Sequence, residues 1–188
     1  MSRPAVFLDR DGTLIEERGY LERLSKLSLF PWTGDAVRLL NRAGLAVVVI
    51  TNQSGVARGL FDEAFVDEVH QEIGRRIGPA HVDRFYYCPH LPEARDVRYR
   101  TTCDCRKPLP GLIERACREL DLDASRSFMV GDRWLDVECG RAAGVRPLLV
   151  RTGHGAHEET SIASSVQADA ILNNLMEAVG WILRTSSR

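Results

Sequence analysis

The sequence predicts a doubly wound α/β fold in which a mostly parallel sheet carries helices on both faces. Short apolar runs alternate along the chain with stretches of helical periodicity. The clearest run, residues 45–51, is continuous and rich in β-branched residues, which is typical of a strand buried on both faces of a parallel sheet. Polar residues follow directly after several of these runs. That is the sheet edge where such folds bind ligands, so we expect a Rossmann-like architecture.

Length and composition suit one domain over residues 1–188. The chain has 188 residues, of which 44% are apolar and 27% charged, with a formal net charge of −1. No basic stripe indicates nucleic acid, and no apolar run is long enough to cross a bilayer. With no recognisable secretory signal, we expect a cytoplasmic monomer with no nucleic-acid or membrane partner.

The first half is expected to read strand, helix, strand, helix. Residues 4–8 are apolar and bounded by charge, which predicts a buried strand. Thr33 is expected to cap a helix that Gly44 ends, and Asp62 to cap a second helix after the strand over 45–51. His70, within that second helix, is interpreted as a surface residue.

The second half continues the alternation around one long loop. Residues 88–108 have no periodicity, and such loops are uncommon in compact domains unless they are functional or held in place. Residues 153–157, rich in Gly and His, are expected to form a solvated loop. The regular elements are predicted as strand 84–87, a helix starting at Pro110, strand 128–130, helix 134–143, strands 145–150 and 168–171, and a closing helix with apolar residues from Leu172 to Leu183. No insertion is long enough for a large cap domain.

The residues after the predicted strands suit phosphoryl transfer. Asp9 and Asp11 follow the first strand, Thr51 ends the second, and Lys107 and Asp132 follow later in the chain, with Asp136 four residues after Asp132. An aspartate can attack phosphorus, and a second carboxyl can protonate the leaving oxygen. Clustered carboxylates favour Mg²⁺, while lysine and hydroxyl groups stabilise phosphoryl oxygens. Each residue alone has an ordinary reading as a cap, turn or surface group, but their order along one predicted sheet edge favours a catalytic site.

Three cysteines and a histidine lie close together within the long loop. Cys88, His90, Cys103 and Cys105 match the ligand number and type of a closed tetrahedral zinc site. The alternative is a set of free loop cysteines. Because all four positions would be filled by protein, zinc here is expected to be structural and to order the zinc loop, residues 88–108.

These motifs resemble those of haloacid dehalogenase-type phosphatases. The more specific resemblance is to the D-glycero-D-manno-heptose 1,7-bisphosphate phosphatases, which are related to histidinol-phosphate phosphatases. It covers residues 4–150 and rests on three further runs, residues 51–59, 87–90 and 103–108.

The resemblance implies a role for each matching residue. It makes Asp9 the nucleophile and Asp11 the acid/base, with Asp9, the Asp11 carbonyl and Asp132 on Mg²⁺. It assigns Thr51 and Lys107 to the phosphoryl group and also points to zinc in the cysteine cluster. The substrate-binding residues that it implies are Glu17, Arg18, Gly19, Tyr20, Thr51, Asn52, Gln53, Ser54, Arg106, Lys107 and Arg133.

The implied substrate is a small phosphorylated sugar. Arg18, Arg58, Arg106 and Arg133 are expected near an open mouth, where guanidinium groups suit a second phosphate. The expected reaction removes the C7 phosphate of heptose 1,7-bisphosphate through an aspartyl-phosphate intermediate. Histidinol-phosphate hydrolysis, and a zinc-stabilised binding module without catalysis, are the alternatives. The sequence leaves open the anomer, the rate and the role of residues 153–157.

Overall fold

The computed structural model describes residues 2–161 and 167–186. The strands within this part of the chain are β1 (Ala5–Leu8), β2 (Ala46–Asn52), β3 (Arg84–Cys88), β4 (Phe128–Gly131), β5 (Arg146–Val150) and β6 (Ala170–Leu172). The α-helices are α1 (Thr33–Arg42), α2 (Ser54–Ala57), α3 (Glu63–Arg76), α4 (Gly111–Leu120), α5 (Trp134–Ala142), α6 (Gly155–Thr160) and α7 (Leu175–Ser186). Two short 3-10 helices, η1 (Leu24–Lys26) and η2 (Ala124–Arg126), complete the described elements.

The six described strands form one parallel sheet in the order β3-β2-β1-β4-β5-β6. This order confirms the predicted Rossmann-like architecture. From β1 the chain adds β2 and β3 on one side and β4, β5 and β6 on the other, so the strand order reverses between β1 and β4. Ligands bind at such a reversal, beyond the carboxyl ends of the strands.

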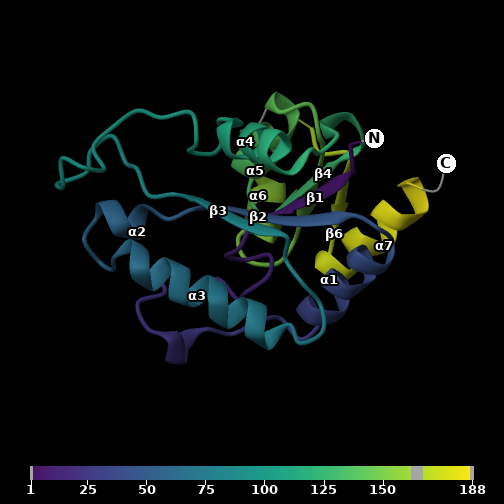
Figure 1. Cartoon of the computed structure of the whole chain (residues 1–188), viewed down its shortest axis with the longest axis horizontal. Helices are drawn as coiled ribbons and strands as arrows, with labels where there is room; N and C mark the ends of the chain where they lie inside the picture. The colour runs from purple at the N-terminus through teal and green to yellow at the C-terminus, as the bar shows by residue number, and fades with distance from the viewer. Residues whose placement is uncertain (1, 162–166, 187–188) are drawn as a thin grey trace.

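Helices cover both faces of the sheet (Figure 1). Successive side chains of a strand point to opposite faces, and β1 shows the result. Val6 and Leu8 pack with apolar residues of α1, α3 and α7, whereas Ala5 and Phe7 pack with those of α4 and α5. The strands are therefore apolar on both faces, as the continuous run in β2 predicted.

One helix start agrees with the sequence prediction and another does not. Asp62 caps α3 by accepting a hydrogen bond from the backbone N–H of Phe65 (2.9 Å). The prediction that Thr33 caps α1 is wrong, because Thr33 is the first residue of the helix and Trp32 precedes it at the cap position. The buried Thr33 hydroxyl instead donates to the carbonyl of Leu14 (2.7 Å), which lies in the segment between β1 and α1.

Three further expectations are corrected. Leu172 ends β6 and does not begin the closing helix, and residues 155–157 of the expected solvated loop belong to α6. His70 is buried, with its ring stacked on Phe85 at 4.6 Å between centroids. Burial is the main reason that the pKa of His70 falls to about 3. Helical spacing alone did not separate this inward position from the exposed ones next to it.

No large cap domain interrupts the fold, as predicted. The segment between β1 and α1 contains only η1 among described elements, and the loop between β3 and α4 contains no helix or strand. That loop extends away from the sheet beyond α2 (Figure 1). Among the described residues, no helix is both long and apolar enough to cross a membrane.

Candidate active site and metal centre

Asp9 and Asp132 lie where the strand order reverses. Asp9 directly follows β1 and Asp132 directly follows the neighbouring strand β4. The backbone N–H of Asp9 donates to the carbonyl of Val130 (2.9 Å), which continues the strand pairing up to the site. Both aspartates are buried, so the sheet itself fixes where their carboxylates lie.

Lys107 lies between two buried carboxylates. Its Nζ is 2.5 Å from Asp9 Oδ1 and 2.6 Å from Asp136 Oδ1, and it also donates to the carbonyl of Ile50 (3.1 Å). Burial by itself would lower the pKa of Lys107, but the carboxylates of Asp136 and Asp9 raise it above its ordinary value. The lysine is therefore a charged group held at the floor of the site.

Asp136 belongs to this cluster, although the family resemblance implies no role for it. Its second carboxylate oxygen accepts a hydrogen bond from the backbone N–H of Arg133 (3.1 Å) at the start of α5. A Cβ on Gly131 would lie 2.3 Å from the Asp136 carboxyl carbon. The spacing of Gly131, Asp132 and Asp136 was thus a usable signal, because a glycine at the strand end leaves room for the second acid.

The acidic cluster changes the protonation of its members. Burial raises the pKa of Asp9 from its ordinary 3.8 to about 7, against the opposing effect of Lys107. Burial, followed by the charges of Asp9 and Asp136, raises the pKa of Asp132 to about 8. Buried carboxylates at this spacing are costly to ionise together unless a cation accompanies them.

The donor set fits a magnesium ion. Asp9, Asp132 and Asp136 each offer a carboxylate oxygen, and these oxygens lie within 4.8 Å of one another. Asp132 Oδ1 is buried and has no hydrogen-bond partner among the described residues. Hard oxygen ligands of this kind suit Mg²⁺, which also retains water and phosphate oxygens in its shell. The contribution of the Asp11 carbonyl stays a prediction.

Two glycines allow the chain to pass close to Asp132. Gly12 and Gly153 have positive φ angles of 80° and 56°, and a Cβ on either would lie about 2 Å from Asp132 Oδ2, at 2.2 Å and 2.1 Å. The backbone N–H of His154 donates to the same oxygen (2.7 Å). Residues 153 and 154 therefore orient Asp132, which gives this segment a role that the sequence did not reveal.

We expect the stability of the magnesium-free protein to fall as pH rises from about 4 to about 8. The folded-state pKa values of Asp9 and Asp132 are raised, so in this range the folded protein holds protons that the unfolded chain has released. That contribution is complete below the unfolded pKa and is lost as pH rises through the folded values. Excess Mg²⁺ should flatten the dependence by compensating the ionised carboxylates.

Thermal unfolding across this pH range, in buffer freed of divalent ions on a chelating resin and again with Mg²⁺, measures the effect. Zinc content is checked in parallel. A Tm that rises with pH between 5 and 8 without Mg²⁺ would contradict the prediction.

The Asp11 carboxylate is held by its neighbours. Arg10, only 3% exposed, donates to both Asp11 oxygens through Nε (3.1 Å) and Nη2 (3.2 Å). Gln53 Nε2 donates to Asp11 Oδ2 (3.0 Å) and to the hydroxyl of Thr51 (2.8 Å), while Gln53 Oε1 accepts from Arg10 (2.9 Å). Asp11, Thr51 and Gln53 thus form one network. Arg10, which is also buried, was not predicted as part of this network, because hydrophobic periodicity does not identify a buried charged residue that follows a strand.

Asn52 holds the backbone of Lys107. Its Nδ2 donates to the Lys107 carbonyl (3.1 Å), and its Oδ1 accepts from the Lys107 N–H (3.0 Å). The family resemblance implies a substrate-binding role for both Asn52 and Gln53. In the structure both side chains have protein partners, so they arrange the catalytic groups from the side of the cavity.

The acidic cluster, Lys107 and the network around Asp11 line one cavity of about 260 Å³, a volume suited to a small molecule. The predicted catalytic, magnesium and substrate residues all line it except Arg18. Tyr20 and Ser54 both line the cavity, and their hydroxyl oxygens lie within hydrogen-bond distance of each other at 3.4 Å. His154 Nε2 lies 3.9 Å from a carboxylate oxygen of Glu17. Short loops, including the one with Gly19, therefore form the walls.

Only two of the four arginines expected at the mouth line the cavity. Arg106 donates through Nη1 to the carbonyl of His90 (3.2 Å), and Arg133 Nε lies 3.6 Å from Glu158. Arg18 instead pairs with Glu16 in its own loop, and Arg58, on the exposed surface, is outside the lining. Two guanidinium groups thus remain for an anionic substrate.

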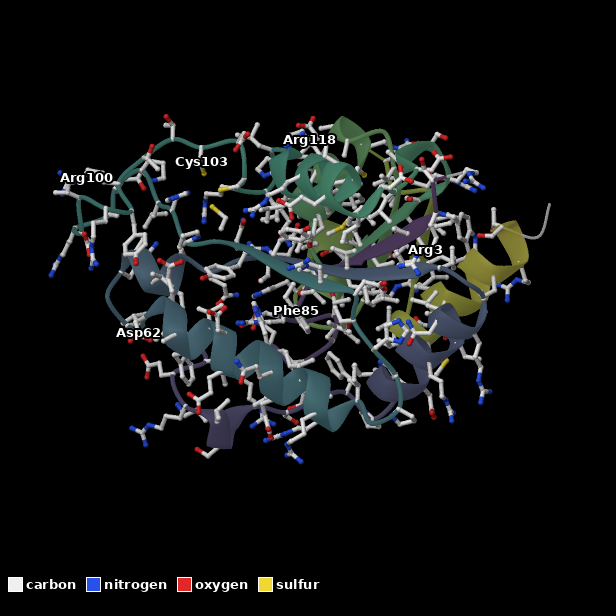
Figure 2. The ribbon with its side chains drawn as sticks, viewed as in Figure 1. Arg3, Asp62, Phe85, Arg100, Cys103 and Arg118 are labelled. Atoms are coloured by element: carbon white, nitrogen blue, oxygen red, sulfur yellow. The ribbon has the colours of Figure 1, made fainter. Side chains whose placement is uncertain are left out.

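The cysteine cluster has the geometry of a tetrahedral metal site. The sulfur atoms of Cys88, Cys103 and Cys105 lie 3.1 to 3.5 Å apart, and His90 Nδ1 lies 3.4 Å from Cys105 and 3.8 Å from Cys88. Ligand atoms around zinc in a tetrahedron are separated by roughly 3.5 to 3.8 Å. The sulfur atoms lie at or slightly below this separation, so the four ligand atoms are gathered closely enough to hold a zinc ion without an open position. Figure 2 shows Cys103 on the long loop between its outer end, at Arg100, and the sheet.

We expect Cys103→Ser to lower zinc content and to loosen the loop that carries Arg106 and Lys107. Activity should fall because Lys107 reaches Asp9 from the end of this loop, while the magnesium ligands stay in place. Metal analysis and phosphate release measure the two effects. Cys117→Ser is the matched control, because Cys117 lies on α4 outside the cluster. Full activity in a zinc-free Cys103→Ser protein would contradict the prediction.

Comparisons with known proteins agree with this geometry. Residues 104–178 match a family model described as HAD-hydrolase-like. The chain is 37% identical over 186 residues to D-glycero-beta-D-manno-heptose-1,7-bisphosphate 7-phosphatase of Haemophilus ducreyi, covering 97% of this chain and 100% of that protein. It is 40% identical over 179 residues to the enzyme of the same name from Escherichia coli K12, covering 94% and 92%.

A solved structure is also similar over nearly its whole length. This is D,D-heptose 1,7-bisphosphate phosphatase from B. bronchiseptica, complexed with magnesium and phosphate. The two chains superimpose with a TM-score of 0.86 at 30% identity, covering 97% of this chain and 99% of that one.

Proposed function

This chain belongs to the HAD-like D-glycero-beta-D-manno-heptose-1,7-bisphosphate 7-phosphatase family, and we propose that it hydrolyses the C7 phosphate of that β-anomeric bisphosphate. It is a phosphoric monoester hydrolase. The whole chain, residues 1–188, is proposed to act as one phosphatase domain.

The position of Asp9 is the observation that carries the proposal. Asp9 lies at the floor of a small-molecule cavity, at the end of β1 and next to the strand reversal. Lys107 touches its carboxylate, and two further buried carboxylates lie beside it. A carboxylate fixed in this way is suited to attack phosphorus, because the sheet prevents it from moving away.

We propose that magnesium is held by Asp9, Asp132 and the Asp11 carbonyl. Asp136 is paired with Lys107 next to them. When bound, the ion supplies positive charge to the carboxylates and to the phosphoryl oxygens. The thiolates of Cys88, Cys103 and Cys105 with His90 are proposed to hold zinc, which orders the loop and takes no part in hydrolysis. We also propose a cytoplasmic location, where cysteines are kept reduced and able to bind metal. The monomeric state stays a prediction.

The proposed reaction has two steps. An Asp9 carboxylate oxygen forms a bond to phosphorus as the bond to the C7 oxygen breaks, and Asp11 gives its proton to that sugar oxygen. Asp11, held by Arg10 and Gln53, then takes a proton from water, and the water oxygen attacks the aspartyl phosphate. Inorganic phosphate leaves and Asp9 is restored. Lys107 Nζ and Thr51 stabilise the phosphoryl oxygens in both steps.

Arg106 and Arg133, two of the three arginines that line the cavity, support a substrate with a second phosphate, since the third, Arg10, is bonded to Asp11 and Gln53. Arg106 and Arg133 line the cavity and are more exposed than the buried Lys107. Guanidinium groups bind phosphate in a bidentate manner. We propose that they contact the phosphate that is retained on C1, while the sugar lies against the loop with Glu17 and Tyr20.

A phosphate-release assay with Mg²⁺ tests the substrate. The α and β anomers of heptose 1,7-bisphosphate are compared with histidinol phosphate and with p-nitrophenyl phosphate, a generic ester without a second phosphate. The proposal expects the highest kcat/KM for the β anomer. A preference for histidinol phosphate would overturn the substrate assignment, and no turnover of any ester would overturn the catalytic one.

A further inference from the structure

The zinc loop has an outer part that the metal ligands do not explain. Residues 89–102, here called the outer lobe, connect Cys88 to Cys103, contain the ligand His90 near their start, and extend beyond α2 (Figure 1). In Figure 2, Arg100 marks its outer end and Asp62 the nearby start of α3. The lobe has no helix or strand, so its position depends on side-chain contacts.

A single carboxylate links the lobe to two regular elements. Glu63, the first residue of α3, accepts a hydrogen bond from Tyr99 of the lobe (2.9 Å) with one oxygen. With the other oxygen it accepts a hydrogen bond from Tyr87 of β3 (2.8 Å). The set Glu63, Tyr87 and Tyr99 is called the tyrosine clamp below. It joins a helix, an edge strand and the lobe through both oxygens of one side chain.

Both phenols remain donors at neutral pH. Burial, together with the bond to Glu63, raises the pKa of Tyr87, and the bond to Glu63 is the main reason that the pKa of Tyr99 is raised. Hydrogen bonds to a carboxylate are stronger than those between neutral groups. The clamp is therefore suited to hold the lobe in one position.

The clamped lobe packs directly on a wall of the active-site cavity. Leu91 and Ala94 of the lobe, both buried, form a small apolar cluster with Ala57 and Tyr99. Ala57 ends α2, the short helix whose first residue, Ser54, lines the cavity. The lobe therefore packs against α2 and supports this wall of the cavity.

The start of the lobe also contacts a second residue of the cavity wall. The carbonyl of His90 accepts the hydrogen bond from Arg106, which lines the cavity. Neither contact involves Asp9, Asp132 or Lys107. A displacement of the lobe would therefore change the walls that face the sugar and leave the reacting groups in place.

We propose that Glu63, acting through Tyr87 and Tyr99, is a positioning residue for substrate binding, because it holds the outer lobe against α2 and beside Arg106. The proposal rests on the proposed function for the identity of the substrate. It assigns the zinc loop two attachments, the metal near the sheet and the clamp on the lobe.

Glu63→Ala and Tyr99→Phe test the proposal, with Glu68→Ala on the exposed side of the same helix as the control. Hydrogen exchange of residues 91–101 and 54–58, zinc content, and KM and kcat are measured on the full, metal-loaded protein. We expect faster exchange in both segments at unchanged zinc content. KM for the bisphosphate should rise roughly three- to tenfold, which corresponds to part of the energy of one to two charge-assisted hydrogen bonds. The kcat should stay within about twofold of the wild-type value.

Two comparisons make the test specific. Glu63→Gln keeps one acceptor oxygen, so it should give an intermediate KM and intermediate exchange. KM for p-nitrophenyl phosphate, which lacks the sugar and the second phosphate, should not change. An equal rise in KM for both esters, or wild-type exchange and KM in Tyr99→Phe, overturns the proposal.

Exchange is measured without substrate, so its outcome does not depend on which ester the enzyme prefers. If Glu63→Ala fails to fold, Tyr99→Phe, which removes a single oxygen atom, decides the matter alone. Faster exchange with failure on the heptose bisphosphate would overturn the proposed substrate and leave the clamp supported.

Discussion

Asp9→Asn is expected to lower kcat by about 10⁴-fold or more, the scale seen when a covalent nucleophile is removed. The amide has nearly the same shape but cannot form the acyl phosphate. Its position at the end of β1, paired through its backbone to Val130, should be unchanged. Phosphate release with saturating substrate and Mg²⁺ gives kcat, and mass spectrometry of acid-quenched protein detects the phosphorylated Asp9 of the wild type.

The stability of this variant separates chemistry from folding. Burial raises the pKa of Asp9 to about 7, so replacing it with a neutral group should not destabilise the magnesium-free protein at pH 8. Asp35→Asn, on the exposed surface of α1, is the control. Turnover by intact, undeamidated Asp9→Asn within tenfold of the wild type would refute the nucleophile assignment.

Lys107→Met is expected to lower kcat by roughly 10²- to 10³-fold, as for the loss of a preorganised electrostatic group. It should also destabilise the protein by about 3 kcal/mol, because removing one partner of a buried ion pair leaves the other charge uncompensated. Lys107 contacts both Asp9 and Asp136 and is itself buried, so its removal leaves the cluster with no cationic side chain in contact among the described residues. Urea unfolding and steady-state kinetics measure the two effects.

Magnesium should recover part of the lost stability and little of the lost rate. The ion compensates the carboxylates, but it does not replace the ammonium group beside the phosphoryl oxygens. Lys26→Met, in exposed η1, controls for loss of a lysine. A Lys107→Met protein with wild-type kcat would show that the lysine is structural only.

The fold was predictable because its strands are apolar on both faces. A continuous run such as residues 46–50 is typical of a strand inside a covered parallel sheet, and Gly44 and Asp62 correctly marked the end of one neighbouring helix and the start of the other. Helix faces were harder to predict. His70 occupies an inward position on α3 and stacks on Phe85, and a polar residue at such a position reads as exposed until the packing of β3 is known.

The catalytic acids were predictable for a different reason. Asp9 and Asp132 directly follow strands, and parallel strands bring their carboxyl ends to one edge, so sequence order already implied proximity. Arg10, Asp136 and His154 were not assigned, because their roles consist of contacts with residues from other elements. Asn52 and Gln53 were assigned to substrate, yet their side chains hold Lys107 and Asp11.

The amino-acid sequence by itself therefore determined the parallel sheet, the pair of acids at Asp9 and Asp11, and the four candidate zinc ligands of the long loop, because each depends on local pattern and short spacing. Only the tertiary structure decided that Lys107 lies between Asp9 and Asp136, because sequence order does not show that these residues are in contact. It likewise decided that Glu63 joins Tyr87 to Tyr99. Such contacts join residues dozens of positions apart, and only the packing of helices and loops around the sheet brings them together.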